Sequence, residues 1–227
     1  LYKREMNFLL GELIGELNSS HAYKGGGDSE RADRENVGYL GLNYKVDNGM
    51  YKIDEIINGA QWDTEVRSPL AIPGVKVTEG DYLIAVNGKK LSVDKDPYSA
   101  FQGLANKTVE LTFKDGKADT TKKVIVNLLN DETRLRHLAW IEKNRKRVDE
   151  ATDGKIGYVY VRSTGTDGQT ELIRQFMAQV DKEGLIIDER FNNGGQIPDR
   201  FIEQLNRKPL AYWAVRDGRT WRHPQKA

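Results

Sequence analysis

The chain of 227 residues is 38% hydrophobic and 30% charged, the composition of a soluble globular protein long enough for one large or two small cores. Its 35 basic and 34 acidic residues leave a net charge of +1, so no broad positive field attracts nucleic acid or an anionic membrane. The absence of cysteine excludes disulfides, thiolate nucleophiles and cysteine-bound metals, and His21, His137 and His223 have no metal-binding spacing. We therefore predict no metal, no other cofactor, no nucleic acid and no membrane partner.

An amphipathic helix is predicted at the start of the chain. Apolar residues recur at i, i+3, i+4, i+7, i+8 and i+11, as on a helix packed against a core; they are Met6, Leu9, Leu10, Leu13, Ile14 and Leu17. We expect this helix to end near Asn18. The stretch ELNSSHAYKGGGD (16–28) follows, in which Ser20 and His21 are either catalytic or only part of a loop that ends the helix. The glycines and charges after them predict a flexible link to the next domain.

Residues 35–130 predict a β-rich domain, because short apolar runs alternate with turn signals. Four segments have the pattern of strands and a fifth that of a helix; the strands are GYLGLNYKV (38–46), YKIDEIING (51–59), DYLIAVNGKKL (81–91) and TVELTFKDG (108–116), and the helix is DPYSAFQGLANKT (96–108). Asn87-Gly88 and Asp115-Gly116 suit tight hairpin turns.

This order of elements resembles a PDZ domain of the bacterial and archaeal protease type. The resemblance rests on GYLGL (38–42), at the position of the carboxylate-binding loop, and on SPLAIPGVKVTEGDYLIAVNGKKL (68–91), similar to that family's signature. It implies a groove where a peptide adds a strand and its terminal carboxylate meets backbone N–H groups. The corresponding loop residues are Tyr39, Leu40, Gly41 and Leu42. A blocked groove, with the domain as a structural spacer, is the alternative, and the residues leave both open.

The last third, residues 131–227, predicts part of an α/β core. DETRLRHLAWIEKNRKRVDEATDG (131–154) has one apolar stripe on a charged helix, and its mixed charges favour a solvated face over a nucleic-acid-binding one. The strand KIGYVYVRS (155–163), the helix DGQTELIRQFMAQVDKE (167–183) and the buried strand GLIIDERF (184–191) then form a βαβ crossover with a parallel pair.

A glycine turn follows that second strand. Asn192, Asn193, Gly194 and Gly195 stand at its carboxyl end and before another helix, where α/β folds place ligands. Glycines there let the backbone approach a substrate and direct N–H groups at an oxyanion, although an ordinary tight turn has the same spacing.

Taken in order, five segments resemble the carboxyl-terminal half of the tricorn protease family, serine peptidases related to the C-terminal processing proteases. They are NSSHAY (18–23), the PDZ-like insert, RHLAWIEKNRKRV (136–148), KIGYVYVRSTG (155–165) and GLIIDERFNNGG (184–195). The resemblance covers essentially the whole chain. It implies that His21 is the general base, that Ser20 orients it, and that Gly194 or Gly195 supplies an oxyanion N–H. It also implies peptide substrates and a homo-oligomer in the full-length protein, with the cytoplasm favoured and the periplasm as an alternative.

The fold class implied is a multidomain α+β and α/β protein. We expect the end of a helical core subdomain with the Ser-His loop in residues 1–34, a PDZ-like domain in 35–130 and an incomplete catalytic subdomain in 131–227. The family's nucleophile lies in a Gly-Ser-Asp-like turn beyond the glycine turn, and its orienting Glu lies further on; neither pattern occurs before Ala227. We therefore expect a portion of a serine peptidase, inactive by itself. The alternatives are a non-catalytic PDZ-like peptide-binding module and an inactive homologue.

Overall fold

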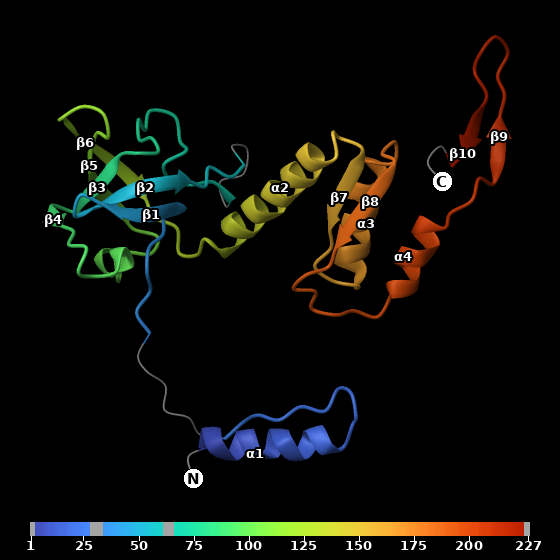
Figure 1. The fold of residues 1–227 in the computed structure, drawn as a ribbon, viewed down its shortest axis with the longest axis horizontal. Helices are drawn as coiled ribbons and strands as arrows, with labels where there is room; N and C mark the ends of the chain where they lie inside the picture. Colours follow the sequence, from blue (N-terminus) through green and yellow to red (C-terminus); the bar gives the residue numbers. More distant parts are fainter. Residues whose placement is uncertain (1–2, 28–33, 61–65, 225–227) are drawn as a thin grey trace. The chain divides into compact units, whose positions relative to one another are not determined.

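The computed structural model of the chain describes residues 3–27, 34–60 and 66–224 (Figure 1). The chain divides between Asn36 and Val37 into two compact units, each of which is described by itself. The second unit contains an antiparallel sheet, a long helix and a βαβ crossover. The molecule is thus a mixed α and β, multidomain protein, as the sequence predicts.

The first unit is built around the helix α1 (Lys3–Glu16), which ends close to the predicted Asn18. The expectation that its apolar stripe packs on a core is wrong within this unit. No described residue of α1 is buried, and Leu13 is 65% exposed. An amphipathic helix buries its stripe only against a second layer, and the described residues of this unit supply none.

The second unit begins with a six-stranded antiparallel sheet in the order β1-β2-β3-β5-β6, with β4 paired to β3. Its strands are β1 (Leu42–Asp47), β2 (Met50–Ile56), β3 (Tyr82–Val86), β4 (Lys89–Lys90), β5 (Thr108–Lys114) and β6 (Thr121–Asn127). The sequence analysis identified all of them except β6. That strand was hidden because it is an edge strand with lysines on it, and only Val126 is buried.

The two predicted hairpin turns have different outcomes. Asn87 and Gly88, with φ of 48° and 76°, form the tight turn between β3 and β4, as predicted. Asp115-Gly116 instead opens a longer loop between β5 and β6. The Asp115 N–H donates to the Thr120 carbonyl at 2.9 Å, and the Asp115 carboxylate accepts from the N–H groups of Lys117 and Ala118. These bonds stabilise a wider turn than two residues would make.

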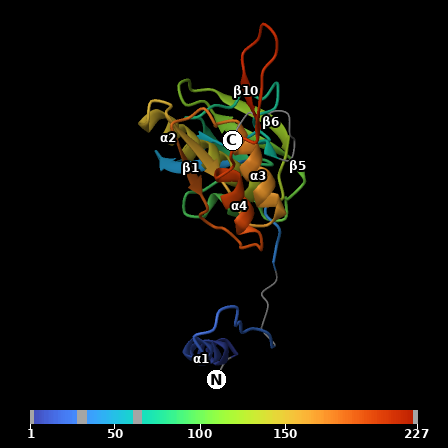
Figure 2. The same ribbon diagram turned by 90° about the vertical axis from the view of Figure 1, so that its right-hand side faces the viewer.

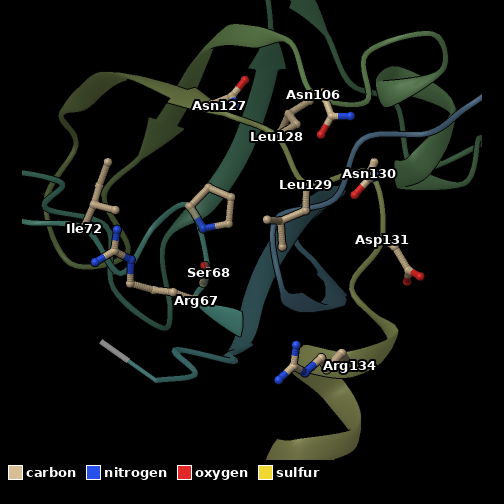
Figure 3. Close-up of a pocket in the computed structure, with 11 residues that line it drawn as sticks. Arg67, Ser68, Ile72, Asn106, Asn127, Leu128, Leu129, Asn130, Asp131 and Arg134 are labelled. Carbon is tan, nitrogen blue, oxygen red and sulfur yellow. The ribbon is translucent and has the colours of Figure 1, made fainter. Parts of the chain in front are cut away.

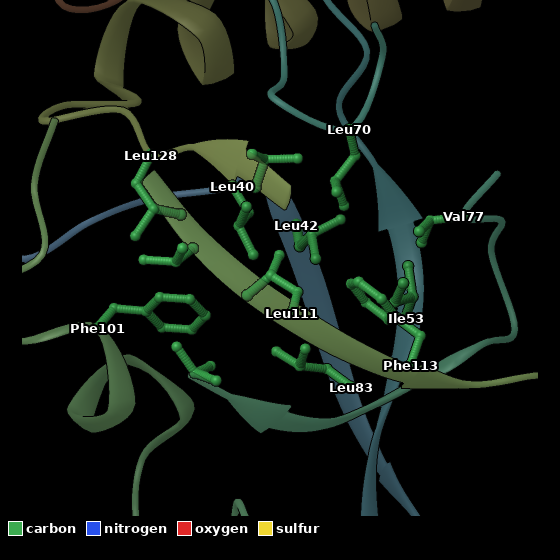
Figure 4. Packing of buried hydrophobic residues seen from close by; sticks show 13 residues of the cluster. Leu40, Leu42, Ile53, Leu70, Val77, Leu83, Phe101, Leu111, Phe113 and Leu128 are labelled. Atoms are coloured by element: carbon green, nitrogen blue, oxygen red, sulfur yellow. The ribbon is translucent and has the colours of Figure 1, made fainter. Parts of the chain in front are cut away.

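The core of the sheet follows from alternation along the strands. Val109, Leu111 and Phe113 recur at every second position of β5 and are at most 2% exposed. They pack with side chains of the other strands, as Figure 4 shows. Phe101, from the 3₁₀-helix η2 (Pro97–Phe101), closes the cluster.

The helix expected over residues 96–108 is only this short 3₁₀ element. Asp96 caps it by accepting from the Tyr98 N–H at 2.8 Å, and Pro97 stands at its first position. Gly103 follows at a φ of 70°, which turns the chain away before a longer helix can form.

The rest of the second unit is the predicted α/β layer. Its elements are α2 (Thr133–Ala151), β7 (Ile156–Tyr160), α3 (Thr166–Met177), β8 (Gly184–Asp188) and α4 (Pro198–Leu205). A separate hairpin of β9 (Ala211–Trp213) and β10 (Trp221–His223) follows, which the sequence analysis did not predict. The strands β7 and β8 pair in parallel, as predicted. Figure 2 shows α3 and α4 side by side, and a buried cluster of Val159, Val161, Leu172 and Phe201 joins them to β7.

The strand β8 is less buried than predicted. Ile186 at its centre is 44% exposed, and Asp188 is its buried residue. The other edge of β7 is covered by two glutamines, Gln175 of α3 and Gln179, which follows the end of that helix. The side-chain amide of Gln179 makes paired hydrogen bonds of 2.8 and 2.9 Å with the Tyr158 backbone, and Gln175 does the same at Tyr160 with 3.2 and 3.1 Å. These amides satisfy an edge that a third strand would otherwise pair.

The helix α2 links the sheet to the α/β layer. Leu135 is 1% exposed and packs so closely on the sheet that a Cβ at Gly41 would lie 2.8 Å from its Cδ2. One turn later, the rings of His137 and Trp140 contact Tyr160 of β7, with centroids 5.0 and 5.4 Å away. The first turn of α2 is therefore part of the packing of the PDZ-like domain, and the next turn packs on the α/β layer.

We propose residues 35–130 as a domain that folds when excised, because its strands pair locally. A piece extended to residue 140 should be more stable by about 2 kcal/mol, since it regains the burial of Leu135. Urea unfolding of both pieces measures this difference, with Leu135→Ala in the longer piece as the control that should remove it. Absence of a cooperative transition in both pieces would contradict the domain boundary.

Candidate active site

The Ser20-His21 segment follows α1 in the first unit. The helix closes with hydrogen bonds from the Leu17 and Asn18 N–H groups, and Asn18 then adopts a φ of 46°. His21 also has a left-handed backbone, with a φ of 60°, which is uncommon for a residue other than glycine. Two reversals within four residues turn the chain back at the helix end, and Lys24 then lies beside Gly11 of α1.

The imidazole of His21 is exposed and has one fixed nitrogen. Its Nδ1 lies 3.1 Å from the Tyr23 hydroxyl, and the two rings meet edge to face with centroids 6.2 Å apart. Within the described part of the chain, Nε2 has no hydrogen-bond partner, and Ser20 makes no bond to the ring. Tyr23 was not predicted as a site residue, although it stands only two positions from His21. The loop thus leaves one imidazole nitrogen unbonded among the described residues.

The glycine turn lies in the second unit and is bonded to the segment after β7. The Asn193 N–H donates to the Arg162 carbonyl at 3.0 Å. Thr164 bonds to both sides of the turn, because its N–H donates to the Gly194 carbonyl and its carbonyl accepts from the Ile197 N–H, both at 3.0 Å. The turn is therefore held at the carboxyl ends of both parallel strands, where the sequence places it.

Gly194 and Gly195 differ in what surrounds them. Gly194, at a φ of 88°, faces open space, whereas a Cβ at Gly195 would lie 2.2 Å from the Thr164 carbonyl carbon. The Gly194 N–H donates to the side-chain oxygen of Asn192 at 2.6 Å. Among the described residues, the Gly195 N–H donates to no acceptor. Of the two predicted oxyanion donors, Gly195 is the one whose N–H is available without displacing a side chain.

An ion pair that the sequence analysis missed holds the backbone just before this turn. Asp188, 7% exposed, accepts from Arg190 through Nε at 2.9 Å and Nη2 at 2.5 Å, and from the Tyr158 hydroxyl at 2.6 Å. These bonds, that from Arg190 foremost, lower the pKa of Asp188 to about 2. Burial and the hydrogen bond to Asp188 raise the pKa of Tyr158. The signal in the sequence was a carboxylate ending a strand, two positions before an arginine.

Aromatic rings lie beside this ion pair. The guanidinium of Arg190 stacks 4.7 Å from the ring centre of Trp140, and the Tyr160 hydroxyl donates to the Arg190 carbonyl at 2.9 Å. Phe191 then adopts a φ of 62° and is 79% exposed, with its ring 5.8 Å from that of Trp140. A bulky residue in this conformation is strained, and such strain concentrates at functional sites.

The predicted peptide-binding loop leads into β1, and the backbone of each of its four residues is hydrogen-bonded to another part of the unit. The backbone of Tyr39 pairs with Leu129, and the Leu40 carbonyl accepts from the Ser68 hydroxyl at 2.7 Å. The Gly41 N–H donates to a carboxylate oxygen of Glu132 at 2.9 Å. The Leu42 carbonyl accepts from Arg136 at 2.8 Å.

Two pockets of the second unit contain none of the predicted site residues. One, of about 630 Å³, is lined by residues 67–69, 72, 106, 127–131 and 134 (Figure 3). A larger one of about 1030 Å³ lies between α2, the glutamine-covered edge of β7 and α3. The described residues contain no cluster of three or more His, Asp or Glu side chains able to hold a metal ion. No helix among them is both long and apolar enough to cross a bilayer.

Comparison with known proteins matches residues 38–131 to the tricorn protease PDZ domain. The chain is 31% identical over 223 residues to the Tricorn protease of Thermoplasma volcanium, which covers 98% of this chain and 22% of that protein. It is 34% identical over 222 residues to Tricorn protease homolog 1 of Streptomyces coelicolor, covering 96% and 20%. A crystal structure of the tricorn protease superposes with a TM-score of 0.80 at 25% identity, over 100% of this chain and 22% of that one.

The chain matches a segment of the tricorn protease family. The resemblance seen in its motifs and the PDZ interpretation of its β-rich part are confirmed. The chain spans between a fifth and a quarter of the length of these tricorn relatives.

The glycine turn of this tricorn segment allows a matched stability test. Gly194→Ala and Gly195→Ala both place a side chain at positive φ, which costs about 1–2 kcal/mol. Only Gly195→Ala also drives a Cβ into the Thr164 backbone, and we expect it to lose about 1–3 kcal/mol more. Urea unfolding of residues 1–227 measures both changes, and equal losses would show that the turn does not approach Thr164 as described.

The low pKa of Asp188 predicts how stability depends on pH. Because its folded pKa is about 2 and lies below the unfolded value, the carboxylate stabilises the fold fully above about pH 4. This contribution, about 2 kcal/mol, is lost as the pH falls from about 4 toward 2. Asp188→Asn should therefore be less stable than the wild type at pH 7, and the difference should shrink over that window. A difference that does not change with pH would contradict the ion pair.

Proposed function

We propose that this chain is a portion of a serine peptidase that cleaves peptides through an acyl-enzyme, with His21 as its general base. The nucleophilic serine and an orienting glutamate lie outside these 227 residues in this proposal. The observation that supports it is the match to the Tricorn protease of Thermoplasma volcanium. This one match extends over 98% of the chain and so includes both the Ser-His loop and the glycine turn. In this proposal the whole protein is a cytoplasmic homo-oligomer that acts on peptides. The substrate class, the oligomeric state and the compartment rest on the family resemblance.

The chemistry requires a positioned base. A serine hydroxyl is a weak nucleophile near neutral pH, so an imidazole must accept its proton as the tetrahedral intermediate forms. The hydrogen bond between His21 Nδ1 and Tyr23 holds the ring by one nitrogen. With that Nδ1 protonated, Nε2 is the basic nitrogen that faces the nucleophile. Ser20 has its orienting role in the complete site, through a further partner.

The oxyanion of the intermediate needs fixed N–H donors. We assign this role to the Gly195 N–H, with Gly194 as the alternative, because the Gly194 N–H is already bonded to Asn192. The bonds of Thr164 to the turn and the Asp188–Arg190 pair before it fix this donor in advance. A preformed donor stabilises the transition state without reorganising during the reaction.

His21→Ala in the full-length protein should lower kcat by at least about 10²-fold and change KM less, because the base acts on the transition state. Ser20→Ala should cost less, since the base itself remains. His223→Ala, which removes another exposed histidine, is the matched control and should leave turnover unchanged. Steady-state hydrolysis of a fluorogenic peptide provides the measurement.

The isolated chain provides a second test of the proposed catalytic site. No serine follows Gly195 up to Ala227, so pure residues 1–227 should not hydrolyse the peptide. Hydrolysis by the isolated chain, or normal turnover by full-length His21→Ala, would show that the catalytic site is placed wrongly.

A further inference from the structure

Glu132 is a buried carboxylate, 7% exposed, at the start of α2. A carboxylate loses its hydration on burial and is stable there only if charges and hydrogen-bond donors replace the water. Its Oε2 accepts from the Gly41 N–H at 2.9 Å, and its Oε1 accepts from Arg136 Nε at 2.6 Å and from the Tyr98 hydroxyl at 3.3 Å. Donors from three separate elements therefore converge on one carboxylate.

Glu132 does not serve the helix at which it stands. It occupies the N-cap position of α2, but its side chain makes no capping hydrogen bond to the described helix. Asp131 caps the start of the helix instead, because its carboxylate accepts from the Thr133 N–H at 2.7 Å. The side chain of Glu132 instead reaches back across 91 positions to the loop before β1.

The site that receives this carboxylate is rigid. Gly41 has a φ of 69°, and a Cβ there would meet Leu135 and the Ile57 carbonyl, so its N–H faces Glu132 only because the residue is glycine. Arg136 is held in place by the Leu42 carbonyl at 2.8 Å and the Asn43 side chain at 2.6 Å. Burial, together with the charge of Glu132, raises the pKa of Tyr98, which keeps its hydroxyl a donor.

The site also lies at the end of an open strand edge. β1 is the terminal strand of the sheet, and the carbonyl of its first residue, Leu42, points to Arg136. A backbone N–H and a guanidinium beside such an edge bind the terminal carboxylate of a peptide that adds as a further strand. The geometry is that of a carboxylate receptor whose ligand is supplied by the chain itself.

We propose that Glu132 is an internal ligand that closes the carboxylate site of Gly41, Tyr98 and Arg136 to the free C-termini of peptides. Glu132 holds α2 on the sheet, and removal of its carboxylate opens the site to a peptide C-terminus. This role is independent of peptidase activity, because none of the three receptor residues belongs to the Ser-His loop or the glycine turn.

The test uses residues 1–227 and a fluorescein-labelled peptide of five alanines and a terminal valine, as the free acid and as the amide. The wild type should not bind either form detectably. Glu132→Ala should bind the free acid at least about tenfold more tightly than the amide. Glu142→Ala, which removes an exposed carboxylate of the same helix, is the matched control and should behave as the wild type. Arg136→Met added to Glu132→Ala should abolish the gain.

Circular dichroism and urea melts establish whether each variant folds. Glu132→Ser vacates the site and places a preferred residue at the N-cap of α2, and is the second variant if Glu132→Ala unfolds. Three results would overturn the proposal. The first is that the wild type binds the free acid as tightly as Glu132→Ala does, and the second is that a folded variant binds neither form. The third is that both variants unfold, because Glu132 would then be required by the fold and would not be a displaceable ligand.

Discussion

The ion pair between the buried Glu132 and the partly buried Arg136 is the interaction on which the arrangement of the second unit depends. Glu132 is the N-cap of α2 and Arg136 stands in its first turn, yet they hydrogen-bond to Gly41 and Leu42, at the beginning of the PDZ-like domain. A carboxylate removed from water is stable only when charges and hydrogen-bond donors replace its hydration, and these donors are in place at one position of the helix on the sheet. Leu135, between them, fills the apolar contact with Gly41.

A second constraint of the same kind holds the glycine turn. Asp188 ends β8 and fixes Arg190, whose guanidinium lies on Trp140 of α2, so the strand end, the turn and the long helix form one connected region. The strained backbone of Phe191 and the close approach of Gly195 to Thr164 persist because these bonds surround them. The helix α2 therefore contacts the carboxylate site through Arg136 in its first turn and the segment before the glycine turn through Trp140, one turn further on.

Most elements of the second unit could be predicted from the sequence, because their signals are local. Alternation in β5, the Asn87-Gly88 turn and the βαβ order each depend on neighbours within a few residues. The motifs also sufficed to identify the tricorn family. The missed strand β6 and the short η2 show the limit of such signals, since an edge strand rich in lysine and a helix ended by Gly103 differ little from loops in composition.

By itself the sequence determined which residue types stand at the candidate sites: His21 after a helix, two glycines after a strand, and GYLGL before another. The tertiary structure alone decided which side chains face them. Nothing in the spacing of Gly41 and Glu132, 91 positions apart, or of Tyr158 and Asp188, 30 positions apart, indicates that they bond. Hydrogen bonds of this kind require the strands and helices to pack first, because only packing brings distant donors and acceptors within 3 Å and excludes the water that would otherwise satisfy them.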